Sequence, residues 1–192
     1  MPSKNTTKDF LDNQRSHWQD WNIPYSDGEA LYKLIVENNF TSVLEIGTSS
    51  GHSTIWLSYA MQQTGGKVTT IEIDQTRYNK AIKNFELAGV SNLIDARLGD
   101  ALHIIPTLTE TFDFIFSDAT LTIQPKESYL LFFKAADPKL RVNGLYTMHN
   151  VTDGFGDDGR FFKYVDNLGN YQTSIIRASS AGISVSKKIK SR

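Results

Sequence analysis

The amino-acid sequence predicts an α/β protein: a seven-stranded, mostly parallel sheet with helices on both faces and an antiparallel hairpin at its C-terminal end. Two observations carry this prediction. Short apolar runs alternate with helical patterns over most of the chain, which is typical of parallel strands joined by crossover helices. Near the end, two apolar runs are separated only by Ala178 to Ala181, too few residues for a crossover helix, so these strands must pair antiparallel.

The strands are recognised by apolar, β-branched runs bounded by turn residues. The predicted strands, in order, are Ser42–Ile46, Lys67–Ile73, Ile94–Leu98, Phe112–Ser117, Gly144–Met148, Tyr171–Arg177 and Gly182–Lys187. The first five follow the βα rhythm, and the last two form the hairpin. Five βα units closed by a hairpin differ from the plain dinucleotide-binding arrangement.

The helices are recognised by their capping residues and apolar faces. Ser26 and Glu29 have the spacing of a capping box and predict a helix start. Gly89 suits the left-handed position that ends a helix. The helices predicted after the first strand are Ser53–Met61, Asp74–Ala88, Ala101–Leu108, Lys126–Ala136 and Asp158–Val165.

Composition indicates a folded, globular protein. Hydrophobic residues make up 40% and charged residues 21% of the chain. A chain of 192 residues is long enough to bury a hydrophobic core. We expect one domain over residues 1–192, with a polar, partly helical extension at 1–22 and a core at 23–192.

Charge and cysteine content exclude several classes of function. The net charge of −1 leaves no basic footprint for nucleic acid, so nucleic-acid binding is not expected. The absence of cysteine excludes disulfides, thiolate metal sites and a cysteine nucleophile. The sequence has neither a signal-peptide pattern nor a run of roughly 20 apolar residues that would span a membrane. A cytoplasmic protein is therefore expected.

Glycines and acidic residues follow the first three strands, at the edge where open α/β sheets bind ligands. Gly47 and Gly51 allow a sharp turn, but their spacing does not fit the dinucleotide fingerprint, and the turn lacks the lysine of a phosphate-binding loop. Glu72 lies 21 residues after Gly51, in position to accept hydrogen bonds from a ribose. The turn Leu98–Ala101 places Asp100 where an adenine edge would lie.

Together these segments resemble the motifs of the catechol-type and caffeoyl-type O-methyltransferases, class I enzymes with a Rossmann-like methyltransferase fold. The matching segments are Leu44–Thr54, Thr70–Asp74, Leu98–Ala101 and Phe112–Asp118, and the likeness runs from about Ile23 to the strand at 182–186. The resemblance implies S-adenosylmethionine as cofactor and a small hydroxylated, possibly aromatic, methyl acceptor as partner. It also implies cofactor contacts from Glu45, Gly47, Ser50, Gly51, Ser53, Glu72, Ile73, Gly99, Asp100, Ala101 and Asp118.

The catalytic pattern of this family is only partly present. The family holds a divalent metal with an Asp after the fourth strand and an Asp-Asn pair after the fifth; these positions are Asp118 and His149-Asn150 here. The position of the family's lysine base is Leu121, and the next lysine is Lys126. Two roles stay open for His149: general base, because histidine titrates near neutral pH, or metal ligand with Asp118 and Asn150. An imidazole ligand would shift the metal preference from magnesium toward manganese, iron or zinc.

The sequence leaves other questions open as well. Methylation of a nucleoside in RNA and a cofactor-binding protein without catalysis are the rival functions. The acidic loop at 153–158 is either a lid over the acceptor or a solvated loop. Trp18, Trp21 and Tyr25 would wall an aromatic acceptor pocket or pack a homodimer interface.

Overall fold

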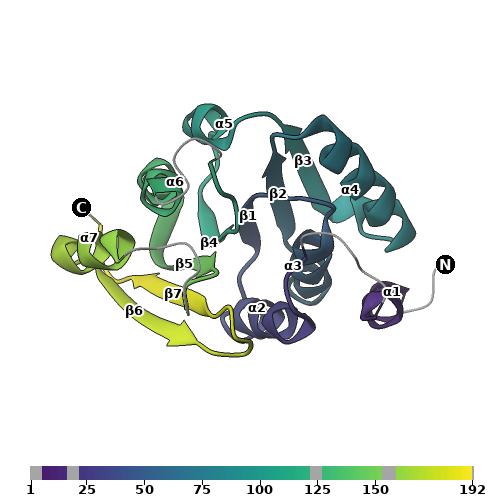
Figure 1. Cartoon of the computed structure of the whole chain (residues 1–192), viewed down its shortest axis with the longest axis horizontal. Helices are drawn as coiled ribbons and strands as arrows, with labels where there is room; N and C mark the ends of the chain where they lie inside the picture. Colours follow the sequence, from purple (N-terminus) through teal and green to yellow (C-terminus); the bar gives the residue numbers. More distant parts are fainter. Residues whose placement is uncertain (1–5, 17–21, 122–126, 153–158, 192) are drawn as a thin grey trace.

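The computed structural model describes residues 6–16, 22–121, 127–152 and 159–191. Seven strands form one sheet in the order β3-β2-β1-β4-β5-β7-β6 (Figure 1). The strands are β1 (Ser42–Ile46), β2 (Lys67–Glu72), β3 (Ile94–Leu98), β4 (Phe112–Ser117), β5 (Leu140–His149), β6 (Tyr171–Ile176) and β7 (Ile183–Lys188). Strands β1 to β5 pair in parallel, while β7 pairs antiparallel with both β5 and β6. The predicted sheet and its closing hairpin are thus confirmed.

The helices cover both faces of the sheet. They are α1 (Thr6–Gln14), α2 (Tyr25–Glu37), α3 (His52–Thr64), α4 (Gln75–Leu87), α5 (Ala101–Thr107), α6 (Ser128–Ala136) and α7 (Arg160–Leu168), with 3-10 turns at Ser91–Leu93 and Asp137–Lys139. Helices α1 to α4 contribute to one buried cluster, and α5 to α7 contribute to the other (Figure 1). The chain therefore folds as the three-layer arrangement that alternating βα units require.

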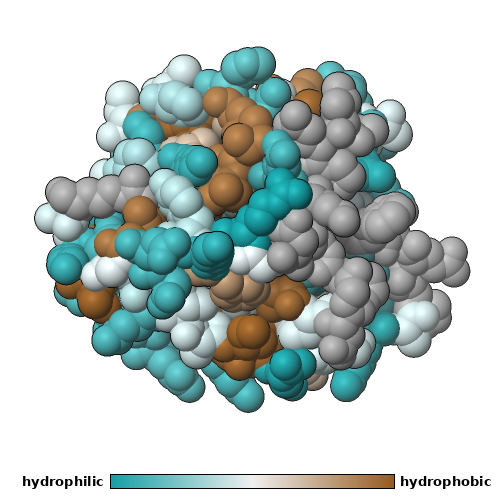
Figure 2. Space-filling model, turned by 60° about the vertical axis from the view of Figure 1, so that its left-hand side comes forward, coloured by the Kyte–Doolittle hydropathy of each residue, from teal (hydrophilic) through white to brown (hydrophobic). Residues whose placement is uncertain are grey.

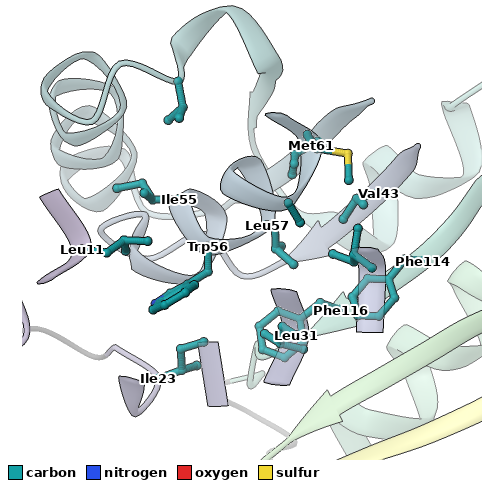
Figure 3. Close-up of a cluster of buried hydrophobic side chains, with 14 of the residues drawn as sticks. Leu11, Ile23, Leu31, Val43, Ile55, Trp56, Leu57, Met61, Phe114 and Phe116 are labelled. Carbon is teal, nitrogen blue, oxygen red and sulfur yellow. The ribbon is translucent and has the colours of Figure 1, made fainter. Parts of the chain in front are cut away.

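Each face has its own hydrophobic core. Leu31 of α2, Trp56 of α3 and Phe114 of β4 meet in the first core (Figure 3). In the second core, Phe133 of α6 packs edge-on against Tyr146 of β5, with ring centroids 5.0 Å apart. Because both faces are buried, the central strands carry nearly continuous apolar runs, which is why the sequence identified them well.

Most of the predicted elements differ at their ends from those of the structure by one to three residues, and two boundaries differ for a physical reason. The capping box was wrong: α2 begins at Tyr25 with Pro24 at the N-cap, and no side chain caps it. The fixed φ of Pro24 and its carbonyl, which accepts from the N–H groups of Asp27 and Gly28, start the helix instead. Strand β5 begins at Leu140 rather than Gly144, because Asn143, with φ of +68°, makes an irregularity within the strand rather than a turn before it.

The N-terminal segment is part of the first core. Leu11 of α1 is fully buried there, and the Thr7 hydroxyl donates to the Ala88 carbonyl at 3.0 Å. Helix α1 thus closes the outer side of α3 and α4 rather than lying loosely on the surface.

The surface is polar with scattered apolar groups. Figure 2 shows hydrophobic residues in separate groups between hydrophilic ones on the visible face. The exposed large hydrophobic side chains of the described residues are Ile73, Leu87, Leu98, Val142, Ile175 and Ile189. They lie on several different elements, as expected of ordinary surface positions. Within the described ranges, no helix combines the length and apolar character needed to cross a membrane.

Candidate active site

The loop after β1 lies at the centre of the carboxyl edge of the sheet. Gly47 and Gly51 have φ of +97° and +93°, which disfavours any residue with a Cβ. A Cβ on Gly47 would lie 2.9 Å from the Asp118 carbonyl oxygen, so the loop packs directly against the end of β4. The Ser50 hydroxyl is buried without a hydrogen-bond partner among the described residues. The loop therefore places a backbone that allows close approach next to Asp118, and it carries at Ser50 a hydroxyl that is unpartnered within the described ranges.

Glu45 of β1 supports this loop through buried hydrogen bonds. Its carboxylate has no solvent exposure and accepts hydrogen bonds from the hydroxyls of Ser53 at 2.5 Å, Thr70 at 2.6 Å and Thr54. The Ser53 hydroxyl is thus directed inward, toward Glu45. Burial raises the pKa of Glu45 to about 7, although the three hydroxyls act in the opposite direction. Direct cofactor contact by Glu45 and Ser53 remains a prediction.

The raised pKa of Glu45 makes stability depend on pH. Between its ordinary value of 4.5 and about 7, the folded protein binds a proton that the unfolded chain has released, so the free energy of unfolding falls as pH rises through this window. Glu45→Gln is expected to remove this part of the pH dependence, about 3 kcal/mol over the window. Urea unfolding of both proteins at pH 5 and pH 8 measures the difference. Glu29→Gln, at an exposed position of α2, is the matched control, and equal slopes for all three proteins would contradict the assignment.

Glu72 ends β2 beside the same loop. Its Oε2 accepts from the Ser49 N–H at 2.6 Å, and its Oε1 accepts from the Asp74 N–H at 2.9 Å. Two backbone donors thus fix the orientation of the carboxylate before any ligand binds. Ile73, the next residue, is 69% exposed, which leaves an apolar surface beside a fixed acid. An acid next to an apolar side chain suits the hydroxylated, aromatic parts of a nucleoside.

The turn after β3 is built around Asp100. The Gly99 N–H donates to the Glu72 carbonyl at 2.8 Å, which ties this turn to β2. Asp100 caps α5 by accepting from the Leu102 N–H at 2.8 Å, and Ala101 begins the helix. The carboxylate therefore has a structural task in addition to the adenine contact that the resemblance implies.

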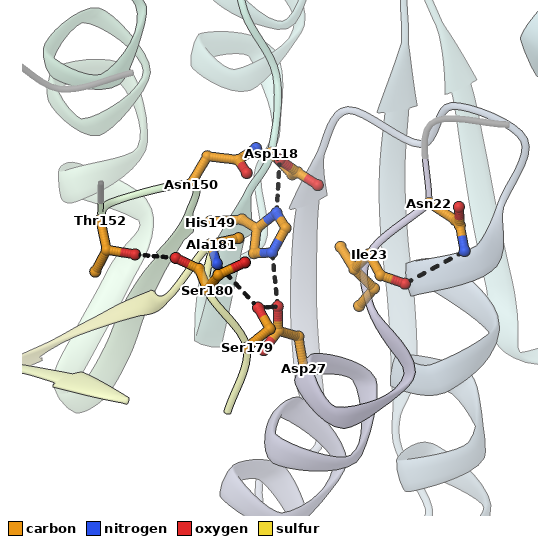
Figure 4. A network of polar contacts seen from close by, with 10 residues as sticks. All are labelled: Asn22, Ile23, Asp27, Asp118, His149, Asn150, Thr152, Ser179, Ser180 and Ala181. Carbon is orange, nitrogen blue, oxygen red and sulfur yellow. Dashed lines mark hydrogen bonds and ion pairs between the residues drawn. The ribbon is translucent and has the colours of Figure 1, made fainter. Parts of the chain in front are cut away.

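Asp118, His149 and Asn150 come together at the ends of β4 and β5 (Figure 4). The His149 Nδ1 lies 3.4 Å from Asp118 Oδ1, and the Asn150 amide nitrogen lies 3.3 Å from the same oxygen. His149 is nearly buried, and its Nε2 lies 2.9 Å from Asp27 Oδ2. The imidazole is thus held between two carboxylates. Burial lowers the pKa of His149, but the contacts with Asp118 and Asp27 raise it more, to about 9.

These contacts do not fit a divalent metal. Both ring nitrogens of His149 face carboxylates, and Asn150 presents its amide nitrogen rather than its oxygen to Asp118. A metal ligand must offer a free lone pair, whereas the Nε2 atom of His149 is engaged with Asp27. In the part of the chain that the structure describes, no three His, Cys, Asp or Glu side chains are grouped to hold a metal ion. The imidazole stands beside Asp118 instead, and no reaction step is assigned to a metal.

Two residues of this site were missed from the sequence. Asp27 is fully buried and accepts from the Ser179 hydroxyl at 2.6 Å as well as contacting His149. Asp27 shares its spacing with Leu31 and Ile35 on the buried face of α2, and an acid on an apolar stripe is a signal that points to a partner. Ser179 lies in the loop of the C-terminal hairpin, and nothing in its sequence surroundings distinguishes it.

Two other histidines and Tyr25 are not among the contacts that the structure describes for His149. The side chain of His103 is 87% exposed, and burial lowers the pKa of His52 to about 4. Tyr25 is partly exposed and packs edge-on against Trp56, with ring centroids 4.8 Å apart. Lys126, the acidic loop at 153–158, Trp18 and Trp21 lie outside the described residues.

Sequence comparison relates this chain to known methyltransferases. Residues 44–151 match a family model described as a methyltransferase domain. The chain is 35% identical over 114 residues to a catechol O-methyltransferase from Niastella koreensis, covering 57% of this chain and 49% of that protein. It is 32% identical over 173 residues to caffeoyl-CoA O-methyltransferase 1 from Eucalyptus globulus, covering 84% of this chain and 68% of that protein. The matches thus span from about half to about two thirds of the relatives' length.

Solved structures share the fold. An O-methyltransferase from Streptomyces achromogenes, involved in tomaymycin synthesis and solved with S-adenosylmethionine, has a TM-score of 0.78 at 24% identity, over 96% of this chain and 90% of that one. An O-methyltransferase from Bacillus cereus, in complex with S-adenosylhomocysteine, has a TM-score of 0.78 at 24% identity, over 99% and 93%.

The fold is that of the Rossmann-like methyltransferases. The chain belongs to this methyltransferase family, with relatives among the catechol and caffeoyl-CoA O-methyltransferases. The predicted family is confirmed.

Proposed function

We propose that this chain transfers a methyl group from S-adenosylmethionine to a hydroxyl of a small, aromatic acceptor, with His149 as the general base. The observation that carries the proposal is that the loop after β1 packs against Asp118, which lies next to His149. Gly47 packs against the backbone of Asp118, whose side chain lies 3.4 Å from the Nδ1 of His149. A base is thus positioned beside the loop that would hold the methyl donor.

The residues at the carboxyl edge suit this cofactor. The loop from Gly47 to Gly51 allows close backbone approach, and the buried Ser50 hydroxyl is available as a partner. Glu72, already oriented by backbone donors, would accept hydrogen bonds from the ribose hydroxyls, and Ile73 would pack on the adenine. Bound there, S-adenosylmethionine supplies a methyl group activated by its positively charged sulfur.

The chain's own residues handle the acceptor proton. Asp118 would accept a hydrogen bond from the acceptor and align its hydroxyl, while the neutral form of His149 takes the proton on Nδ1. The new bond joins the acceptor oxygen to the methyl carbon as the carbon–sulfur bond breaks. The products are the methyl ether, S-adenosylhomocysteine and a proton that leaves His149 for solvent. Alignment and proton removal are the main tasks left to the protein, since the donor is already reactive.

The experiment that tests this function has two stages. Calorimetric titration with S-adenosylhomocysteine, with and without magnesium or manganese, is expected to show binding that the metals leave unchanged. Transfer of labelled methyl groups to a panel of catechols and other small phenols is then expected to give methyl ethers, also in the presence of EDTA. Loss of turnover in EDTA would contradict the metal-free mechanism. Binding without turnover of any hydroxylated acceptor would favour a protein that retains only the cofactor site.

Location and assembly are part of the same proposal. The absence of cysteine and the net charge of −1 support a cytoplasmic protein that acts on a small molecule rather than on nucleic acid. Salt-dependent RNA binding would favour the rival reaction on a nucleoside. We also propose one catalytic domain over residues 1–192 that is able to form a homodimer, which sedimentation analysis of the purified protein tests.

A further inference from the structure

Three distant parts of the chain meet at one buried carboxylate. Asp27 comes from the first turn of α2, His149 from the end of β5, and Ser179 from the loop between β6 and β7 (Figure 4). The Oδ2 atom of Asp27 lies 2.9 Å from His149 Nε2 and 2.6 Å from the Ser179 hydroxyl. The Ser179 hydroxyl in turn accepts from the Ala181 N–H at 3.1 Å, so the hairpin loop holds it in place.

The contact with Asp27 decides which nitrogen of His149 carries the proton. Both ring nitrogens face carboxylates, but Nε2 lies 2.9 Å from Asp27, whereas Nδ1 is 3.4 Å from Asp118 and has no hydrogen-bond partner among the described residues. Because a carboxylate oxygen accepts hydrogen bonds, the neutral ring keeps its proton on Nε2 and donates it to Asp27. The neutral ring then has its lone pair on Nδ1. That atom lies 3.4 Å from Asp118, on the side of the cofactor loop. Without Asp27, neither the tautomer nor the ring orientation would be fixed.

The packing around α2 shows how this helix reaches the site. A Cβ on Gly28 would lie 2.3 Å from the Trp56 indole nitrogen, so only glycine lets α2 approach α3 this closely. Asp27 precedes Gly28 in α2, so the close packing of α2 and α3 brings the Asp27 carboxylate to His149 at the end of β5. Asp27 Oδ1 is buried and has no hydrogen-bond partner within the described ranges. An incompletely satisfied buried carboxylate costs stability, and such a cost is typical of functional sites.

We propose that Asp27 is a positioning residue that holds His149 in the Nε2–H form, with Nδ1 directed at the acceptor hydroxyl, and that Ser179 locks the Asp27 carboxylate in this orientation. The inference rests on the proposed function for its catalytic part, since it assigns how the general base is oriented. Its structural part, the protonation of Nε2, stands on the contacts of Asp27 alone. The logic is that of an acid that orients a histidine base without touching the substrate.

The first measurement is independent of activity. Nitrogen-15 NMR of protein labelled at histidine distinguishes an Nε2–H ring from an Nδ1–H ring above the pKa of His149. The wild type is expected to show the Nε2–H form, and Asp27→Asn is expected to add the Nδ1–H form. Ser179→Ala, which keeps the carboxylate, is expected to change the ring less. An unchanged Nε2–H signal in Asp27→Asn would overturn the positioning role.

The second measurement is the split between kcat and KM. Asp27→Asn is expected to lower kcat by about 10²-fold or more, as loss of an oriented base does, with the KM for S-adenosylmethionine unchanged. Asp9→Asn, at an exposed position of α1, is the matched control. Wild-type kcat in Asp27→Asn would overturn the proposal. If Asp27→Asn does not fold, Ser179→Ala carries the test, with a smaller loss of kcat expected and an unchanged kcat contradicting it.

The two measurements separate this inference from the proposed function. If the wild type transfers no methyl group to any hydroxylated acceptor but shows the Nε2–H ring that depends on Asp27, the proposed function fails while the orientation by Asp27 stands. If methyl transfer is found and the tautomer of His149 does not change in Asp27→Asn, the proposed function stands and the positioning role fails.

Discussion

Replacing His149 with glutamine is expected to lower kcat by about 10²–10⁴-fold, because the variant lacks the group that removes the acceptor proton. Glutamine is preferable to alanine here. Asp27 is fully buried, and removing its partner entirely would leave an uncompensated charge that costs about 3–5 kcal/mol. The amide of glutamine still offers a donor to Asp27, so the affinity for S-adenosylhomocysteine is expected to stay at the wild-type value. Methyl-transfer kinetics and calorimetry on the same preparation give both quantities.

The pH profile identifies the base more sharply than the rate alone. His149 has a raised pKa of about 9, so at neutral pH most of the enzyme holds it protonated and unable to accept a proton. The value of kcat/KM is therefore expected to rise with pH up to about 9 in the wild type and to lose this limb in His149→Gln. His103→Gln, at an exposed histidine, is the matched control. A His149→Gln enzyme that keeps the wild-type rate and limb would remove His149 from the mechanism.

The strands and the mostly parallel sheet with its C-terminal hairpin could be predicted because they follow from local pattern and from the lengths of the connections. β1 and β4 are buried on both faces, so their apolar runs define them. These two strands and the edge strand β3 were predicted to the residue. Boundaries set by backbone geometry were harder. Asn143 and Gly144 have the composition of a turn, yet the pairing of β5 with β4 continues past them as an irregularity. Tertiary pairing decides such cases, and a local pattern does not contain it.

The site residues also fall into those that local pattern predicts and those that depend on tertiary packing. The glycine turn and Glu72 follow strand ends directly, so their positions at the carboxyl edge follow from topology. Asp27 reaches His149 only through the packing of α2 against α3, and Ser179 reaches Asp27 only through the folding of the hairpin loop. Their sequence separations from His149 are large, and no spacing rule connects them. The proposal of a base rather than a metal ligand for His149 rests on its contact with Asp27, which the sequence does not reveal, so the sequence left both roles open.

Glu72→Ala is expected to weaken binding of S-adenosylhomocysteine by about 1–3 kcal/mol, which is about 5- to 150-fold in Kd. The carboxylate is held by the N–H groups of Ser49 and Asp74, so its orientation is fixed before any ligand binds. Pre-orientation of this kind makes each hydrogen bond to the ribose more effective, because less freedom is lost on binding. Calorimetric titration of wild type and variant measures the change, and equal Kd values would contradict the ribose assignment.

Loss of affinity alone does not show that Glu72 touches the ribose, since alanine would also release the Ser49 N–H and loosen the loop. The S-adenosylhomocysteine analogue without the ribose 2′-hydroxyl separates the two effects. If Glu72 accepts a hydrogen bond from that hydroxyl, wild type loses affinity for the analogue, whereas Glu72→Ala binds the analogue and the parent ligand alike. If the two losses simply add, Glu72 acts through the loop. The carboxylate would then belong with Glu45 as a support of the backbone, and the ribose partner would have to be sought among the other groups at the carboxyl edge.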